Sequence, residues 1–217
     1  MEKILLFEDF TKLYGRWKGG NNRKENDYIR NFISKQEHPE EFSITEDGKV
    51  NSNISVKITQ EDLVNNKLPF EFGYVAGGFR ISDTQIESLK GAPKNVGKDF
   101  EIWDCPKLTS LEFSPNKVGV NYVLYKVGVE DMTGCSQDIG GSLKMGTCKK
   151  LKSLVGSPEK INVDLTVIGC DEFDSIEGLP KEIGGDLNLV SCKKQFLFSD
   201  IPEECTIKGK RFLRDNI

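Results

Sequence analysis

The strongest constraint on the fold of this chain is a repeat of 21 or 22 residues. Six segments share the pattern apolar-x-apolar-x-x-small, and they start at Phe79, Phe100, Tyr122, Leu143, Leu165 and Leu187. An earlier copy starts at Val56, and Ile207 is read as a degenerate later copy. A unit of this length with one three-residue strand cannot bury its own apolar face, so the units must stack on one another. The repeat therefore predicts a solenoid with short parallel strands.

Other positions keep the same register. Five places after each start stands a small or apolar residue: Thr84, Cys105, Val127, Cys148, Cys170 and Cys192. Spaced apolar pairs follow in most units, and a proline recurs at Pro93, Pro115, Pro158, Pro180 and Pro202. Helix interiors tolerate proline badly, so these return segments are not helices. Each unit is predicted to contain a short strand, an inward small residue, an irregular apolar return and a turn.

Two strings carry a family resemblance. FRISDTQIESL and LKMGTCKKLKSL resemble the leucine-rich repeat consensus, and GAPKNV, GSPEKI and GLPKEI are similar to the short class found in bacterial effector proteins and phage-encoded repeat proteins. The resemblance covers roughly residues 52–209, and the unit around Tyr122 departs from it by lacking the cysteine and the regular leucines. It implies an α+β solenoid, a leucine-rich repeat stack with a helical N-terminal cap, that binds a macromolecule on its concave sheet.

Three regions follow from this pattern: a cap or docking segment over 1–41, the solenoid over 42–209, and a tail over 210–217. Within the first, Leu6, Phe10, Leu13 and Trp17 form one helical stripe and Tyr28, Ile29, Phe32 and Ile33 form a second. Amphipathic helices are normally buried against a core, which favours a cap. The alternative is a docking peptide, because LLFEDF resembles short openings of some phage proteins. Residues 42–58 are predicted to form a hairpin around Asp47 and Gly48.

Composition excludes several classes of function. The formal charge of 30 − 34 = −4 argues against nucleic acid as the partner. No stretch approaches the ~18 apolar residues of a membrane helix, so neither a membrane partner nor a secretory signal is expected. With one histidine, no P-loop and no zinc CxxC pair, we expect no enzyme, no metal site and no cofactor. The predicted compartment is the cytoplasm, or the host cytoplasm if the chain is phage-encoded.

The cysteine column should point into the core. Cysteine behaves there as a small hydrophobe, and we expect reduced structural thiols rather than a metal ladder or a chain of disulfides. A second column, Asp99, Asp164 and Asp186, precedes the strands and is interrupted by Asn121 and Ser142. We interpret it as a solvated turn rather than a cation site.

The candidate binding residues are those predicted to point outward. Trp103 and Tyr125 occupy equivalent places on consecutive strands, about 5 Å apart along the stack. Aromatic anchors with a charged rim are typical of protein-binding hot spots. The predicted site therefore comprises Arg80, Glu101, Trp103, Asp104, Tyr125, Lys126, Lys144 and Ile168. Stacking on a sugar ring would use the same residues, and a loop folded over the pair would bury them instead.

These observations predict a non-enzymatic module that recognises another protein through its concave sheet, such as a host factor bound by a phage or effector-like protein. The alternative is a structural or virion-associated protein that docks through its N-terminal segment.

Overall fold

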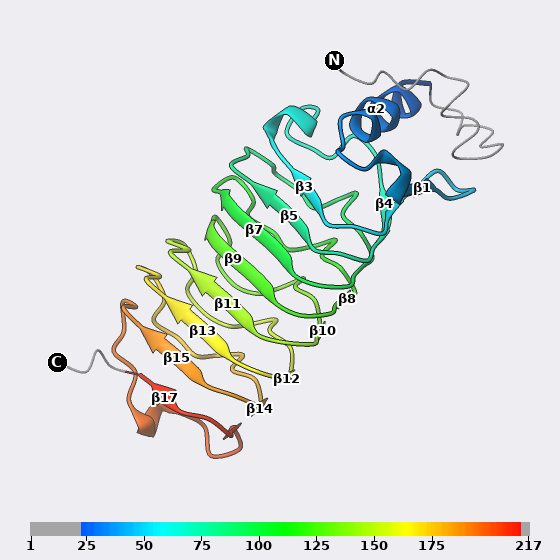
Figure 1. The fold of residues 1–217 in the computed structure, drawn as a ribbon. Helices are drawn as coiled ribbons and strands as arrows, with labels where there is room; N and C mark the ends of the chain where they lie inside the picture. The colour runs from blue at the N-terminus through cyan, green and yellow to red at the C-terminus, as the bar shows by residue number, and fades with distance from the viewer. Residues whose placement is uncertain (1–22, 214–217) are drawn as a thin grey trace.

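The computed structural model describes residues 23–213, which form a parallel β-solenoid with a short helix at its N-terminal end (Figure 1). Each coil contributes one strand to an eight-stranded sheet along the length of the stack. In spatial order these strands run from β3 to β17. Their bounds are β3 (Val56–Ile58), β5 (Phe79–Ser82), β7 (Phe100–Cys105), β9 (Tyr122–Val127), β11 (Leu143–Gly146), β13 (Leu165–Ile168), β15 (Leu187–Val190) and β17 (Arg211–Phe212).

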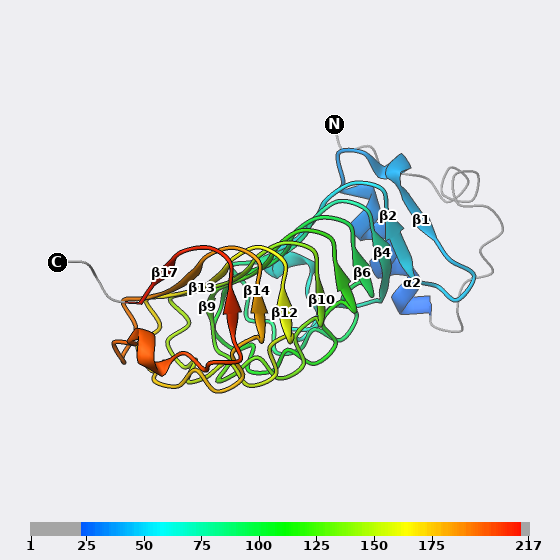
Figure 2. The same cartoon turned by 90° about the horizontal axis from the view of Figure 1, so that it is seen from below.

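Shorter strands line a second side of the coils, a few residues before each long strand (Figure 2). They form a six-stranded sheet and a three-stranded sheet. The first contains β1 (Phe42–Ile44), β2 (Val50–Ser52), β4 (Phe72–Val75), β6 (Asn95–Val96), β8 (Lys117–Val118) and β10 (Asp138–Ile139). The second contains β12 (Lys160–Ile161), β14 (Glu182–Ile183) and β16 (Thr206–Ile207).

The predicted register is confirmed in the eight-stranded sheet. The start residues pair in sequence from Val56 through Phe79 and Phe100 to Leu187. The assignment of Ile207 to this column is wrong, because Ile207 pairs with Ile183 in the three-stranded sheet. Arg211 takes the place opposite Leu187. Each coil has a second buried apolar position, which forms a column of its own through the stack. Ile183 and Ile207 both belong to that column, and its spacing equals that of the start residues.

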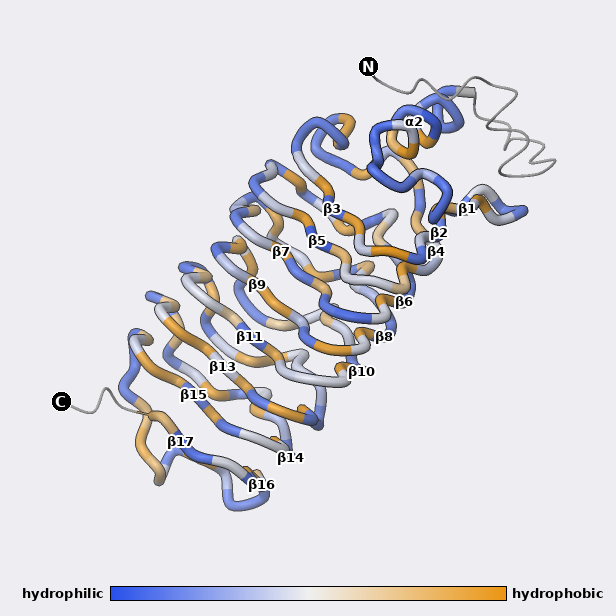
Figure 3. Tube along the Cα trace, viewed as in Figure 1, coloured by the Kyte–Doolittle hydropathy of each residue, from blue (hydrophilic) through white to orange (hydrophobic). Residues whose placement is uncertain are grey.

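A left-handed backbone residue ends the alternation of each long strand. We number places from the start residue of each long strand, so that the first place is the residue after it. In β7 the start residue and the second and fifth places are buried, whereas the first and third places face outward. The fourth place has a positive φ in six consecutive coils: Asp83, Asp104, Lys126, Thr147, Gly169 and Ser191. This left-handed residue lets two neighbouring side chains face outward before the chain turns back into the core. The hydropathy of the chain alternates accordingly along the strands (Figure 3).

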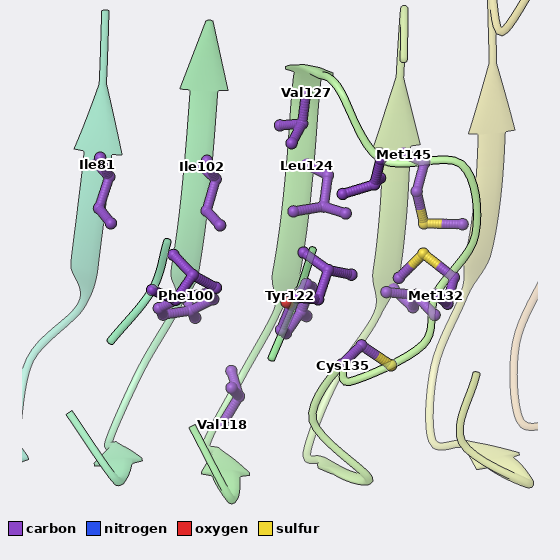
Figure 4. Close-up of a cluster of buried hydrophobic side chains, with 14 of the residues drawn as sticks. Ile81, Phe100, Ile102, Val118, Tyr122, Leu124, Val127, Met132, Cys135 and Met145 are labelled. Atoms are coloured by element: carbon purple, nitrogen blue, oxygen red, sulfur yellow. The ribbon is translucent and has the colours of Figure 1, made fainter. Parts of the chain in front are cut away.

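Stacked aromatic and aliphatic side chains fill the interior (Figure 4). Phe79 and Phe100 have ring centroids 6.1 Å apart, and Phe100 lies 5.2 Å from Tyr122. The hydroxyl of the buried Tyr122 is 2.9 Å from Ser114 Oγ, so its polar end is satisfied. The core is therefore continuous from coil to coil.

The unit around Tyr122 is regular despite its unusual sequence. Val129 and Met132 are buried in its return segment and take the role of the spaced leucines. They lie seven and ten places after Tyr122, whereas Leu108 and Leu111 lie eight and eleven places after Phe100. The one-residue difference lies between strand and return, and it accounts for the alternation between 21 and 22 residues.

Helix α2 (Arg23–Ser34) covers the N-terminal end of the stack (Figure 1). Ile29, Phe32 and Ile33 are buried, while Tyr28 is exposed. The Phe32 ring lies 5.7 Å from Phe72, which joins the helix to the aromatic core. The first predicted helical stripe, Leu6 to Trp17, lies outside the described residues.

The predicted hairpin is confirmed over β1 and β2, which pair antiparallel, with Gly48 at a φ of 84° in the turn. Strand β17 lies in the segment that the sequence analysis treats as a tail. In residues 23–213 no helix is long and apolar enough to cross a membrane.

The register predicts different effects for neighbouring residues of β13. Leu165 is fully buried and Thr166 faces outward. Leu165→Ala should lower the free energy of unfolding by about 2 to 5 kcal/mol because it leaves a cavity. Thr166→Ala should change it by less than about 0.5 kcal/mol. Urea denaturation of the two variants measures both, and equal losses would contradict the register.

Two glycines with positive φ should differ in their tolerance of a side chain. A Cβ at Gly169 (φ 65°) would meet only Thr147, with its nearest atom, Oγ1, at 3.7 Å, whereas one at Gly156 (φ 86°) would lie 2.5 Å from Thr133 Cα. Gly169→Ala should cost about 1 to 2 kcal/mol, from the backbone conformation alone. Gly156→Ala should cost more, because the neighbouring backbone must move. Chemical denaturation compares them, and a smaller loss for Gly156→Ala would show that the return segments are loosely packed.

Candidate functional site

The two outward aromatic residues of β7 and β9 form one stacked pair. Trp103 and Tyr125 are paired in the sheet register, and their ring centroids lie 4.9 Å apart with the planes inclined by 38°. Both side chains are half-buried. The predicted adjacency is confirmed, and the described residues leave part of each ring exposed. We call the side of the eight-stranded sheet that carries them the outer face.

Charged side chains frame the pair on both sides. The Arg80 guanidinium carbon lies 4.7 Å from the centre of the Trp103 ring, and Lys126 Nζ lies 5.6 Å from that of Tyr125. Lys126 also forms a 3.3 Å ion pair with Asp104. Cations over aromatic faces are attracted by the ring quadrupole. The sequence-predicted set thus converges into a cluster with aromatic rings at its centre and charges around them.

Glycine at the next coil makes room for Tyr125. Gly146 is paired with Tyr125 in the register, and a Cβ on Gly146 would lie 2.9 Å from Tyr125 Cδ2. The tyrosine ring therefore leans over Gly146 along the outer face. A side chain at position 146 would push the ring away.

The two remaining predicted residues lie on the same face but outside this cluster. Lys144 is half-buried and pairs with Val123 in the register. Ile168 is 38% exposed and is separated from Tyr125 by Gly146. Ser82 occupies in β5 the place that Trp103 has in β7, a place predicted to face outward, but it is buried beside Trp103 in the register. The structure therefore brings together six of the eight predicted residues.

A pocket of about 260 Å³ with charged side chains in its lining adjoins the cluster at the N-terminal coils. Arg80 and Glu101 line it, so the pocket and the aromatic pair share Arg80. The sequence analysis did not select the other lining residues, which are Ser55, Val56, Lys57, Gly78, Lys98 and Asp99. Lys57 was detectable, because it occupies the first outward place of the copy that starts at Val56.

The residues just before the long strands form a hydrogen-bonded ladder. The backbone N–H of Asn121 donates to Asp99 Oδ1 at 3.0 Å, and that of Ser142 donates to Asn121 Oδ1 at 3.0 Å. The ladder continues through Asp164, Asp186 and Lys210. Asn121 and Ser142 therefore do not interrupt the column, because each supplies the same side-chain acceptor as aspartate. The column satisfies backbone donors at the turn, which is a structural role.

The six cysteines are unpaired in the structure, and four of them are buried. In the column, Cys105 Sγ lies 3.3 Å from the carbonyl oxygen of Trp103 and Cys148 Sγ lies 3.5 Å from that of Gly146. Burial raises the pKa of the Cys135 thiol to about 12. The hydrogen bond with Cys148, together with burial, raises the pKa of Cys170. The Cys135 and Cys170 thiols are therefore kept protonated, and a protonated thiol is a poor nucleophile and a poor metal ligand.

Within residues 23–213 no group of three or more histidine, cysteine, aspartate or glutamate residues is placed to hold a metal ion. No family model, curated protein or solved structure matches this chain. The candidate site therefore rests on its own geometry.

The raised pKa of Cys135 predicts a loss of stability at alkaline pH. Below pH 9 the thiol is protonated in both states, and between pH 9 and about 12 only the unfolded chain ionises. The free energy of unfolding should therefore fall with pH in this range. Its slope should be steeper than that of Cys135→Ala by up to about 1.4 kcal/mol per pH unit. Denaturation curves of both proteins across this range measure the difference, and equal slopes would show that the thiol ionises as readily when folded.

Proposed function

We propose that this protein is a non-catalytic recognition module that binds another protein through the outer face of the eight-stranded sheet. The observation that carries the proposal is the half-exposed stack of Trp103 on Tyr125, framed by Arg80 and Lys126. Tryptophan, tyrosine and arginine are the residues most enriched among interface hot spots. The stack stands on the third and fourth of the eight strands, counted from β3, so a partner can contact coils on both sides of it.

The rigidity of the support favours recognition. Both aromatic residues stand on six-residue strands that are paired on both edges, and buried residues alternate with them. Side chains held by such strands lose little conformational freedom when a partner binds. Repeat solenoids present extended surfaces of this kind.

The leucine-rich repeat resemblance supports the same proposal by analogy. The strand, the small inward residue and the proline-containing return recur as in the short-repeat class, and a phage or effector-like protein acting on a host factor fits this class. Fold class alone does not fix function, so the residues of the outer face carry more weight. The docking alternative depends largely on residues 1–22, which lie outside the described residues.

The double variant Trp103→Ala/Tyr125→Ala tests this proposal. The full chain, immobilised, should retain a specific protein from a lysate of the host, identified by quantitative mass spectrometry. The double variant should lose it, and direct binding to the purified partner should weaken roughly 30-fold or more, the effect of losing about 2 kcal/mol at an interface centre.

A matched control is Phe113→Ala. Phe113 is 57% exposed and lies in a return segment rather than on the eight-stranded sheet. This variant should retain the partner. If the double variant retains the partner as well as the unmodified protein does, the binding surface lies elsewhere on the molecule. Unfolding of both single aromatic variants would assign the pair to the core, and thermal denaturation distinguishes this case.

A further inference from the structure

Three cationic side chains line the pocket beside the aromatic pair: Lys57, Arg80 and Lys98. Lys57 and Arg80 stand directly opposite each other in the register of β3 and β5. Like charges directly opposite one another in a sheet are destabilising. The free protein therefore holds two positive charges at one place, and a bound anion would relieve their repulsion.

The hydrogen-bonding capacity of these groups is largely unused. Arg80 Nη1 lies 3.8 Å from Glu101 Oε2, an ion pair that is longer than a hydrogen bond. Arg80 Nε is shielded from solvent and has no acceptor among the described residues. Lys57 and Lys98 are exposed and form no ion pair within residues 23–213. Arginine donors left unpaired in a pocket suit the geometry of carboxylate and phosphate groups.

The acidic residues of the pocket do not neutralise this arrangement. Asp99 Oδ1 accepts hydrogen bonds from the Asn121 backbone N–H and from Asn121 Nδ2, so it serves the ladder. Glu101 faces Arg80 from the β7 side. The three cations against these two carboxylates leave a formal excess of one positive charge in a chain whose net charge is −4.

We infer that this pocket binds an oxyanion, a carboxylate or phosphate group, which the partner presents next to the surface that packs on Trp103 and Tyr125. The assignment of the anion to the partner rests on the proposed function. The inference that the pocket binds an oxyanion is independent of that function. Arg80 joins the two parts of the site, because its guanidinium lines the pocket and lies over the Trp103 ring.

Anion titration of the full chain, labelled with ¹⁵N, tests the pocket directly. Inorganic phosphate and acetate are added separately at constant ionic strength, with chloride as the balance. The reporters are the Trp103 indole N–H, assigned with Trp17→Phe, and the backbone N–H of Gly78, which lines the pocket. Saturable shifts with both anions indicate that a carboxylate suffices, and saturation with phosphate alone indicates a phosphorylated group.

Variants locate the bound anion. Arg80→Gln should weaken its binding roughly tenfold or more, because charge-assisted hydrogen bonds are lost. Arg80→Lys, which keeps the charge but not the planar fork, should be intermediate. Lys90→Gln removes one exposed positive charge from a return segment and should leave binding unchanged. The inference fails if neither anion saturates, or if Lys90→Gln weakens binding as much as Arg80→Gln.

The two proposals fail separately. If neither anion saturates but Trp103→Ala/Tyr125→Ala abolishes partner capture, the recognition function stands and the pocket does not bind an oxyanion. If the anions bind but the double variant captures the partner normally, the pocket stands and the recognition surface lies elsewhere.

Discussion

Burial of each coil between its two neighbours is the condition on which the rest of the structure depends. A coil of 21 or 22 residues has too few apolar side chains to form a core alone, and Phe100 is fully buried only because Phe79 and Tyr122 lie on either side of it. This stacking fixes the register, and the register fixes which side chains face outward. The ends lack one neighbour, and α2 supplies it at the N-terminus through Phe32.

The hydrogen-bonded ladder solves a second problem created by stacking. Where the chain turns into a long strand, backbone donors face the previous coil, and unpaired buried donors are costly. Asp99, Asn121 and Ser142 each offer one short side-chain oxygen at that point. Aspartate, asparagine and serine can all fill this role although only aspartate is charged. Charge alone therefore does not predict which residues belong to the column.

The sequence predicted the period, the register of the long strands and the stacked aromatic pair, because all three follow from apolar spacing. It did not predict the end of the repeat, since two apolar columns share the same spacing and Ile207 belongs to the other one. It missed Val129 and Met132 because a valine and a methionine stand there in place of the regular leucines, although their offsets from the start residue are those of Ile86 and Leu89. The pocket was missed because Lys98 lies in a turn, outside the strand columns, and turns had been treated as solvent-exposed connections.

The left-handed residue at the fourth place explains why this sheet can carry a binding cluster at all. Regular alternation would bury every second residue, and the charge at Asp104 or Lys126 would then have to enter the core. Because φ is positive at both positions, each charge stays outside, and the next residue, Cys105 or Val127, is buried instead. This left-handed conformation is energetically unfavourable for residues other than glycine. The backbone is therefore locally strained in successive coils. The same left-handed conformation keeps Lys126 outside the core, within reach of both Asp104 and the Tyr125 ring.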